Sequence, residues 1–128
     1  MYICQYNYIV FSLSFQIDGT RTLGENIADN GGLRAAYNAY VQNKIMDDQE
    51  LPGELEQFSL EQLFFISFGQ LWCEDATPDY IIDQIQTGVH APGELRVIGS
   101  VSNSEEFRVA FGCETGDPMV NDEQCVLW

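Results

Sequence analysis

Two carboxylates four residues apart, Glu25 and Asp29, are the first feature of this 128-residue sequence that could do chemistry. In a helix, four steps of about 100° return to within about 40° of the start, so the two acids share one face. Gly32 and Ala36 extend that face without bulk. Two acids above a smooth surface suit a metal site, or a close helix contact with a group that needs a carboxylate. A solvated acidic face with a glycine break is the alternative that the spacing leaves open.

A histidine and an arginine form a second candidate group. His90 is the only histidine in the sequence, and it is followed by Ala91-Pro92-Gly93 and then by Arg96. A histidine alone in a loop is most often a surface residue, and an arginine in so acidic a chain readily forms a surface salt bridge. The residue types alone therefore leave open both a binding role and an ordinary surface position.

The two acids fall on a helix that we predict from about Thr22 to Asn43. Gly31 and Gly32 weaken this helix by about 1 kcal/mol each relative to alanine. We take this cost as a sign that another backbone or helix passes close to the two glycines. Apolar residues recur along the helix with a period near 3.6, at Leu23, Ile27, Leu33, Ala36, Tyr37, Tyr40 and Val41.

Two further helices are predicted from their start signals. Ser59 and Gln62 have the spacing of a capping box. The helix that they open is apolar on nearly all sides, so we expect it to be buried. Thr77 before Pro78 predicts a shorter helix that runs to about Gln86 and ends at Gly88. The apolar stripe of the longer helix comprises Leu60, Leu63, Phe64, Phe68, Leu71 and Trp72.

The remaining segments are less regular. Residues 1–17 alternate as a strand does. Residues 90–101 are expected to form a loop and then an extended piece. Asn103 and Glu106 have the spacing of another capping box, before apolar residues at helical spacing. The sequence therefore predicts one mainly α-helical unit with long loops.

Charge and cysteine content limit the function further. The net charge of −15 argues against nucleic acid and anionic membrane surfaces as partners, and it favours a cationic or metal-bearing one. Four scattered cysteines are typical of disulfides in an extracellular protein. No signal peptide is expected, because the first residues have no basic region, long apolar core or small-residue cleavage site. No membrane-spanning segment is expected either, because the apolar run over 8–15 is too short to cross a bilayer. Cysteines typical of an extracellular protein, without a segment that would direct export, suggest a piece of a longer protein.

The eleven residues Thr22–Gly32 resemble the zinc-ligand helix of the M13 zinc metallopeptidases, the neprilysin and endothelin-converting-enzyme family. The resemblance runs from about Gly19 to Trp128, with weaker traces back to Cys4. We therefore divide the chain into a divergent segment over 1–17 and the C-terminal part of an M13 catalytic domain over 18–128. Matching segments are Leu63-Phe64-Phe65, Leu71-Trp72-Cys73, His90-Ala91-Pro92-Gly93, Leu95-Arg96-Val97, Ser102-Asn103-Ser104, Phe107, Phe111-Gly112-Cys113 and Cys125-Val126-Leu127-Trp128.

The resemblance implies a fold and a set of roles. The fold is the C-terminal portion of a thermolysin-like (gluzincin) catalytic domain, mainly α-helical with long loops. Glu25 is implied as a ligand of one catalytic Zn²⁺, and Asp29 as a catalytic residue that orients a zinc-bound histidine. His90 is implied to stabilise the oxyanion. Arg96 is implied to bind the peptide substrate through a carbonyl or carboxylate oxygen.

One part of the family's site is absent from this sequence. A single histidine excludes an HExxH helix, so two zinc ligands and the general base are expected in an N-terminal part of the same catalytic domain. We therefore expect a fragment of an enzyme that hydrolyses small peptides, inactive alone. A non-catalytic peptide-binding or pseudo-enzyme module is the alternative, and whether the chain is itself an enzyme stays open.

The family also implies the disulfides and the location. Cys125 is implied to pair with Cys4, while Cys73 and Cys113 match cysteines whose partners lie far upstream. Family members act on the extracellular side of the plasma membrane or are secreted, so the same location is implied for this protein.

Overall fold

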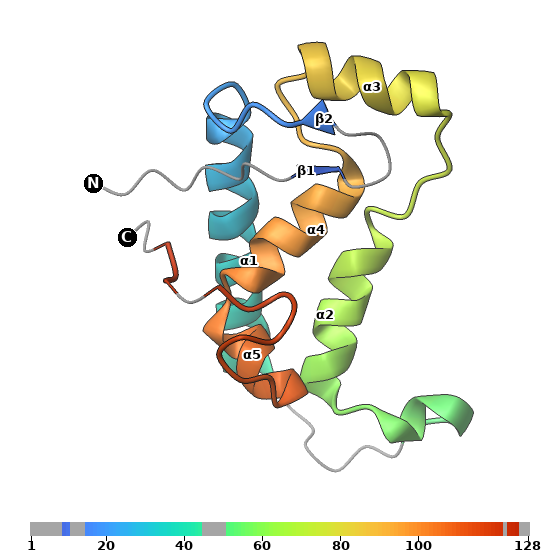
Figure 1. The fold of residues 1–128 in the computed structure, drawn as a ribbon. Coiled ribbons are helices and arrows are strands. Elements are labelled where there is room, and N and C mark those ends of the chain that lie inside the picture. The colour runs from blue at the N-terminus through green and yellow to red at the C-terminus, as the bar shows by residue number, and fades with distance from the viewer. Residues whose placement is uncertain (1–8, 11–14, 45–50, 122, 126–128) are drawn as a thin grey trace.

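Five α-helices dominate the computed structural model, which describes residues 9–10, 15–44, 51–121 and 123–125. A short pair of antiparallel strands comes first, in which Ile9 pairs with Gln16 and Val10 with Phe15. The mainly α-helical fold is therefore confirmed (Figure 1). The elements are β1 (Ile9–Val10), β2 (Phe15–Gln16), α1 (Leu23–Asn43), the 3-10 helix η1 (Gly53–Gln57), α2 (Leu60–Gln70), α3 (Pro78–Thr87), α4 (Gly93–Ser102) and α5 (Glu105–Phe111).

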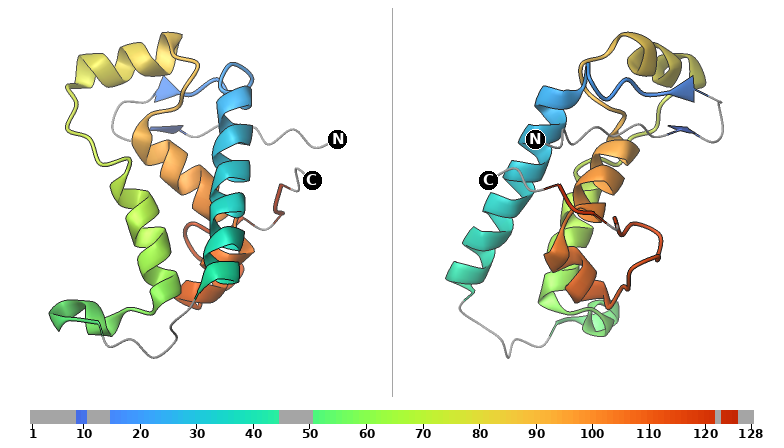
Figure 2. Two further views of the ribbon diagram at one scale, coloured as in Figure 1. Left: turned by 180° about the vertical axis from the view of Figure 1, so that it is seen from behind. Right: turned by 60° about the vertical axis from the view of Figure 1, so that its left-hand side comes forward.

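Helix α4 is central to the arrangement. It contacts α1, α2 and α5, while α3 contacts β2 at one end of the molecule. Both views of Figure 2 show α4 crossing close to α1, with α5 at the opposite end from α3. Two segments that lie about 70 residues apart in the sequence, the start of α1 and the start of α4, are therefore neighbours.

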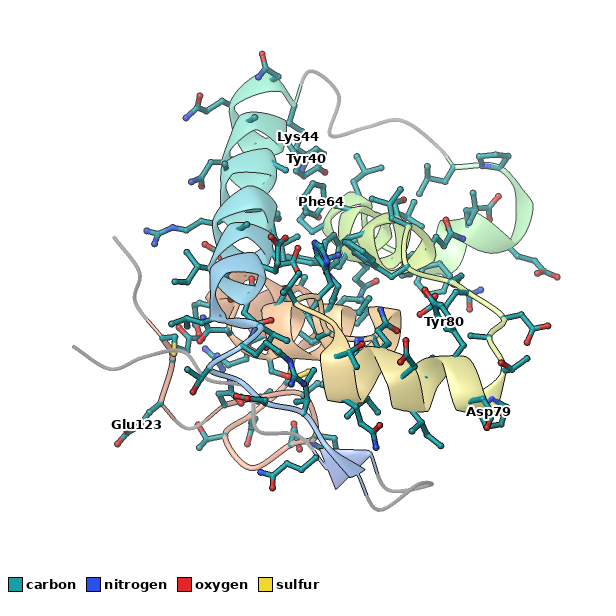
Figure 3. All side chains as sticks on the ribbon, turned by 90° about the horizontal axis from the view of Figure 1, so that it is seen from above. Tyr40, Lys44, Phe64, Asp79, Tyr80 and Glu123 are labelled. Atoms are coloured by element: carbon teal, nitrogen blue, oxygen red, sulfur yellow. The ribbon has the colours of Figure 1, made fainter. Side chains whose placement is uncertain are left out.

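The main core lies where α1, α2, α4 and α5 meet. Leu33, Phe65, Val101 and Phe107 are buried there. Aromatic rings extend this core toward the end of α1, where Tyr40 stacks on Phe64 with ring centroids 5.4 Å apart (Figure 3). A smaller cluster of Ile17, Ala91 and Leu95 joins the segment before α1 to the start of α4. The two clusters hold both ends of the α1–α4 contact.

Three predicted helices begin close to where the sequence signals place them, and two of these, α1 and α3, also end close to their predicted ends. Helix α1 spans nearly all of the predicted range. The capping box is present: Ser59 Oγ accepts from the Gln62 backbone N–H at 3.1 Å, and Gln62 Oε1 accepts from the Ser59 backbone N–H at 3.0 Å. Thr77 Oγ1 accepts from the Tyr80 backbone N–H before α3. These local signals were sufficient because each one is contained within four residues of sequence.

Two local predictions were wrong. Residues 93–102 form helix α4 rather than an extended piece, because the helix buries Leu95, Gly99 and Val101 against its neighbours. The cap of α5 is Ser104, not Asn103, since Ser104 Oγ accepts from the Phe107 backbone N–H at 3.1 Å. The side chain of Asn103 is used elsewhere.

The predicted burial of α2 is also wrong for the described part of the chain. Phe65 is the only residue of this helix that is buried there. Leu71, just after the helix, keeps 78% of its surface exposed. The described helices that pack against α2 cover the side that carries Phe65, so its remaining apolar residues are only partly covered. No helix in the described residues is long and apolar enough to cross a membrane.

Candidate functional site

The predicted site residues Glu25 and Asp29 lie one turn apart on α1, and each contacts a residue in or just before the first turns of α4. Glu25 Oε2 lies 2.9 Å from His90 Nε2. Asp29 accepts two hydrogen bonds from Arg96. The structure therefore brings all four predicted residues together, in two neighbouring acid–base pairs.

The Asp29–Arg96 pair is largely enclosed. Arg96 Nε donates to Asp29 Oδ2 at 2.6 Å, and Arg96 Nη2 donates to Asp29 Oδ1 at 2.5 Å. The exposed fractions of the two side chains are 10% for Asp29 and 15% for Arg96. The Arg96 guanidinium carbon lies 3.8 Å from the ring centroid of Trp72. This two-point contact fixes the guanidinium plane more firmly than a single hydrogen bond would.

The Glu25–His90 pair is open to solvent. The side chains keep 40% and 48% of their surface exposed, respectively. His90 comes just before α4, in the loop that follows Gly88. The Glu25 carboxylate is therefore accessible to a ligand from solvent. The two pairs differ in exposure: Asp29 and Arg96 are largely enclosed, whereas Glu25 and His90 can contact a ligand.

Sequence reasoning missed two parts of the site. Trp72 was placed in an apolar stripe and in a segment that matches the family, but its contact with the Arg96 guanidinium was not predicted. Asn26 and Asn30, which follow Glu25 and Asp29 directly, are buried and hydrogen-bonded. The spacing of four between Thr22, Asn26 and Asn30 was visible in the sequence and marks a polar face beside the acidic one.

Two cavities adjoin the Arg96–Trp72 contact. The smaller, of about 130 Å³, is lined by Trp72, Gln84 and Arg96 among others. The larger, of about 720 Å³, shares Trp72, Cys73 and Glu74 with it. The larger cavity has a mostly apolar lining with acidic residues in it, comprising Gly69, Trp72, Cys73, Glu74, Asp75, Ala76, Pro78, Ile81, Pro92, Glu94, Leu95, Val97 and Ile98.

The donor set offers only part of a zinc site. Within the part of the chain that the structure describes, no group of three or more His, Cys, Asp or Glu side chains could hold a metal ion. A catalytic zinc ion usually takes three protein ligands and keeps one position open. The exposed carboxylate of Glu25 fits as one such ligand, and the remaining ligands would have to come from other residues.

The cysteines differ in state. Cys73 is exposed and free, and Cys113 is partly buried and free. Cys125 is disulfide-bonded. The partner implied for it, Cys4, lies outside the described residues, so that pairing stays a prediction.

The described arrangement is thus two acids on α1 that contact a histidine just before α4 and an arginine in its first turns. Residues 2–127 match the sequence model of Peptidase family M13, so the chain belongs to this family. It is 46% identical over 112 residues to an endothelin-converting enzyme homolog of Locusta migratoria and 46% identical over 115 residues to neprilysin of Homo sapiens.

The alignments cover most of this chain but only a small part of each relative. Each alignment takes in 88% of this chain but only 15% of the relative. The fold also resembles a solved structure described as the Haemonchus galactose containing glycoprotein complex, with a TM-score of 0.79 and 36% identity. That likeness covers 88% of this chain and 20% of the other. The chain thus corresponds to a small part of a metallopeptidase of this family.

Proposed function

We propose that residues 18–128 are the C-terminal part of the catalytic domain of a zinc-dependent metalloendopeptidase that hydrolyses small peptides. The observation that carries this proposal is the convergence of Glu25 and Asp29 on α1 with His90 just before α4 and Arg96 near its start. Family membership supports the metallopeptidase class. The peptide substrates and the extracellular or membrane-surface location follow from the family resemblance.

Each of the four residues has a task that its surroundings allow. Glu25 would hold the zinc ion with its exposed carboxylate. Zinc, when bound, supplies the positive charge that polarises a peptide carbonyl and activates water. His90 would donate a hydrogen bond to the oxygen on which negative charge develops. Both tasks need groups that face solvent, as these side chains do.

Asp29 and Arg96 would act together on the substrate. Asp29 engages Nε and Nη2 of Arg96, which leaves Nη1 to donate to a substrate carbonyl. The Trp72 ring lies against a face of the guanidinium in a cation–π contact. Asp29 is thus proposed as the residue that orients Arg96, in addition to the role that the resemblance implies for it, which is to orient a zinc-bound histidine.

Hydrolysis also needs residues that this sequence does not contain. With one histidine there is no HExxH, so the other zinc ligands and the general base would come from an N-terminal part of the same catalytic domain. We propose that the chain is inactive without that part. The pairing of Cys125 with Cys4, and of Cys73 and Cys113 with upstream cysteines, belongs to the same proposal.

The test compares the chain alone with the chain mixed with a separately produced M13 fragment that carries the HExxH helix. With zinc, the chain alone should cleave no peptide, and the mixture should gain cleavage that a chelator abolishes. Glu25→Gln should remove this gain because an amide is a poor zinc ligand, whereas the exposed Glu54→Gln should not. Chelator-sensitive cleavage by the chain alone would contradict the proposal of inactivity. A mixture in which Glu25→Gln retains full activity would exclude Glu25 as a ligand.

A non-catalytic peptide-binding or pseudo-enzyme module is the second candidate. The cavity of about 720 Å³ and its acidic lining residues favour it, because they would suit a peptide with apolar and basic side chains. Binding of such a peptide to the chain without zinc, together with no cleavage in the mixture, would favour this candidate. Fluorescence of Trp72, which lines the cavity, would report the binding.

A further inference from the structure

A row of buried polar side chains runs along α1 next to the acidic face. Thr22 and Asn26 are each 1% exposed and Asn30 is 9% exposed. Asn26 Nδ2 donates to Thr22 Oγ1 at 3.0 Å, and Asn30 Nδ2 donates to the Asn26 backbone carbonyl at 2.7 Å. Thr22 Oγ1 in turn donates to the Asp18 carbonyl at 3.2 Å. Buried polar groups are costly unless they are paired, so these bonds restrict how the buried side of α1 can be placed.

Asn103, the residue that ends α4, connects this row to the rest of the molecule. Its Nδ2 donates to Asn30 Oδ1 and to the Cys125 carbonyl, both at 3.0 Å. Its Oδ1 accepts from the Cys125 backbone N–H at 2.5 Å. Both hydrogens of the side-chain amide and its oxygen are therefore used. One amide joins α1, the end of α4 and the C-terminal segment.

We propose that Asn103 is a positioning residue, which sets the rotation of α1 so that Asp29 meets Arg96 and Glu25 meets His90. Glu25 and Asp29 directly precede Asn26 and Asn30, so each acid lies about 100° around the helix from the amide row. A turn of about 20° would move a group about 5–6 Å from the axis by roughly 2 Å. That shift is enough to break hydrogen bonds of 2.5–2.6 Å.

The catalytic meaning of this positioning rests on the proposed function, but the positioning itself does not. The contact that it controls is the bond from Arg96 Nε–H to Asp29, which exists without zinc or peptide. Exchange of that proton with water, followed by NMR of the nitrogen-15-labelled chain, reports the contact directly. Failure of the peptidase proposal would therefore leave this test unaffected.

Asn103→Ala removes all three bonds of the amide. It should speed the exchange of the Arg96 Nε–H by about tenfold while the helical circular dichroism signal is kept. Asn103→Asp keeps the acceptor for the Cys125 N–H but sets a carboxylate against Asn30 Oδ1. It should speed the exchange further. Asn30→Ala removes the link on the α1 side and leaves the Asn103–Cys125 bonds, so it should match Asn103→Ala.

Asn43→Ala is the matched control, because Asn43 also lies on α1 and bonds to the Ala39 carbonyl, but at its exposed end. It should leave the Arg96 signal unchanged. The proposal is overturned if Asn103→Ala and Asn30→Ala are folded and exchange as the wild type does, or if Asn43→Ala gives the same acceleration. Loss of the helical signal in both variants would also overturn it, since Asn103 would then support the whole fold rather than one contact.

Discussion

Asp29 and Arg96 are 67 residues apart in the sequence and form the closest polar contact between α1 and α4 among the hydrogen bonds of the candidate site. Their two hydrogen bonds are 2.6 and 2.5 Å long, and solvent reaches little of either side chain. Trp72 covers the guanidinium. A charged pair that is both bidentate and shielded contributes more than an exposed pair of the same residues. The position of Glu25 and Asp29 relative to α4 therefore depends on this contact.

Asp29→Asn should lower the free energy of unfolding by about 2 kcal/mol, because it leaves a shielded guanidinium without its anionic partner. Urea unfolding followed by circular dichroism measures the change. Asp83→Asn on the exposed side of α3 is the control and should cost less than about 0.5 kcal/mol. Equal losses in the two variants would show that the Asp29 carboxylate contributes no more to folding than a surface acid does.

Glu25→Gln should have a different result from Asp29→Asn, although the two acids are one turn apart. Both members of the Glu25–His90 pair are well exposed, so water replaces much of what the substitution removes. We expect a loss below about 0.5 kcal/mol in the same urea experiment. A loss as large as that of Asp29→Asn would make Glu25 a structural residue and would weaken its proposed role as a metal ligand.

Local signals carried the successful predictions of the fold. The Ser59–Gln62 box and the Thr77–Pro78 pair each fix a helix start through bonds between near neighbours. Helix α4 lacked such a signal, and its Val97, Ile98 and Val101 are residue types that favour strands. Burial of its Leu95, Gly99 and Val101 decided the outcome. A helix that depends on packing of this kind cannot be predicted from a short stretch of sequence.

Contacts within the candidate site could not be predicted from local sequence either. The sequence identified Glu25, Asp29, His90 and Arg96 as site residues through the family resemblance. It did not indicate that Asp29 would bond to Arg96, because that pairing depends on how α1 and α4 cross. The spacing of Asn26 and Asn30 was visible, but the amide that completes the row, Asn103, lies 73 residues from Asn30. The sequence alone therefore did not predict which side chains far apart in the chain would bond to one another.

Gly93→Ala should destabilise the chain. A Cβ at this position would lie 2.7 Å from the Trp72 carbonyl oxygen and 3.1 Å from Glu74 Oε1. The backbone before α3 would have to move, at a cost of about 1–3 kcal/mol. The shift should also change Trp72 fluorescence, which serves as a second measurement beside urea unfolding.

Gly32→Ala is the opposite case. We expected a backbone to pass close to this glycine. Among the described residues, and apart from the nearby backbone of α1 itself, no atom lies within 4 Å of the place that a Cβ would take. Alanine should therefore stabilise α1 by up to about 1 kcal/mol through its higher helix propensity. If Gly32→Ala destabilised the chain instead, a close contact in solution would have to involve residues beyond those described.

The contact between Lys44 and Glu61 gives a prediction for the effect of pH. Lys44 Nζ lies 2.7 Å from Glu61 Oε1 where the end of α1 meets α2, and Figure 3 shows Lys44 there beside Tyr40. The hydrogen bond from Lys44 is the main reason that the pKa of Glu61 lies below its ordinary value. Because the pKa is lower in the folded state, the contribution to stability is complete above the ordinary pKa of glutamate. It is lost as the pH falls through the folded-state pKa.

Lys44→Met should therefore lower the free energy of unfolding by about 0.5 kcal/mol at neutral pH, since the pair is partly exposed. The difference from the wild type should shrink toward zero on acidification, as Glu61 becomes protonated in both proteins. Urea unfolding at a series of pH values measures it. Glu61→Gln is the matched variant, and adding Lys44→Met to it should have little effect at any pH. A Lys44→Met difference that stayed constant or grew as the pH fell would mean that Lys44 acts through its packing or another contact, and not through the Glu61 carboxylate.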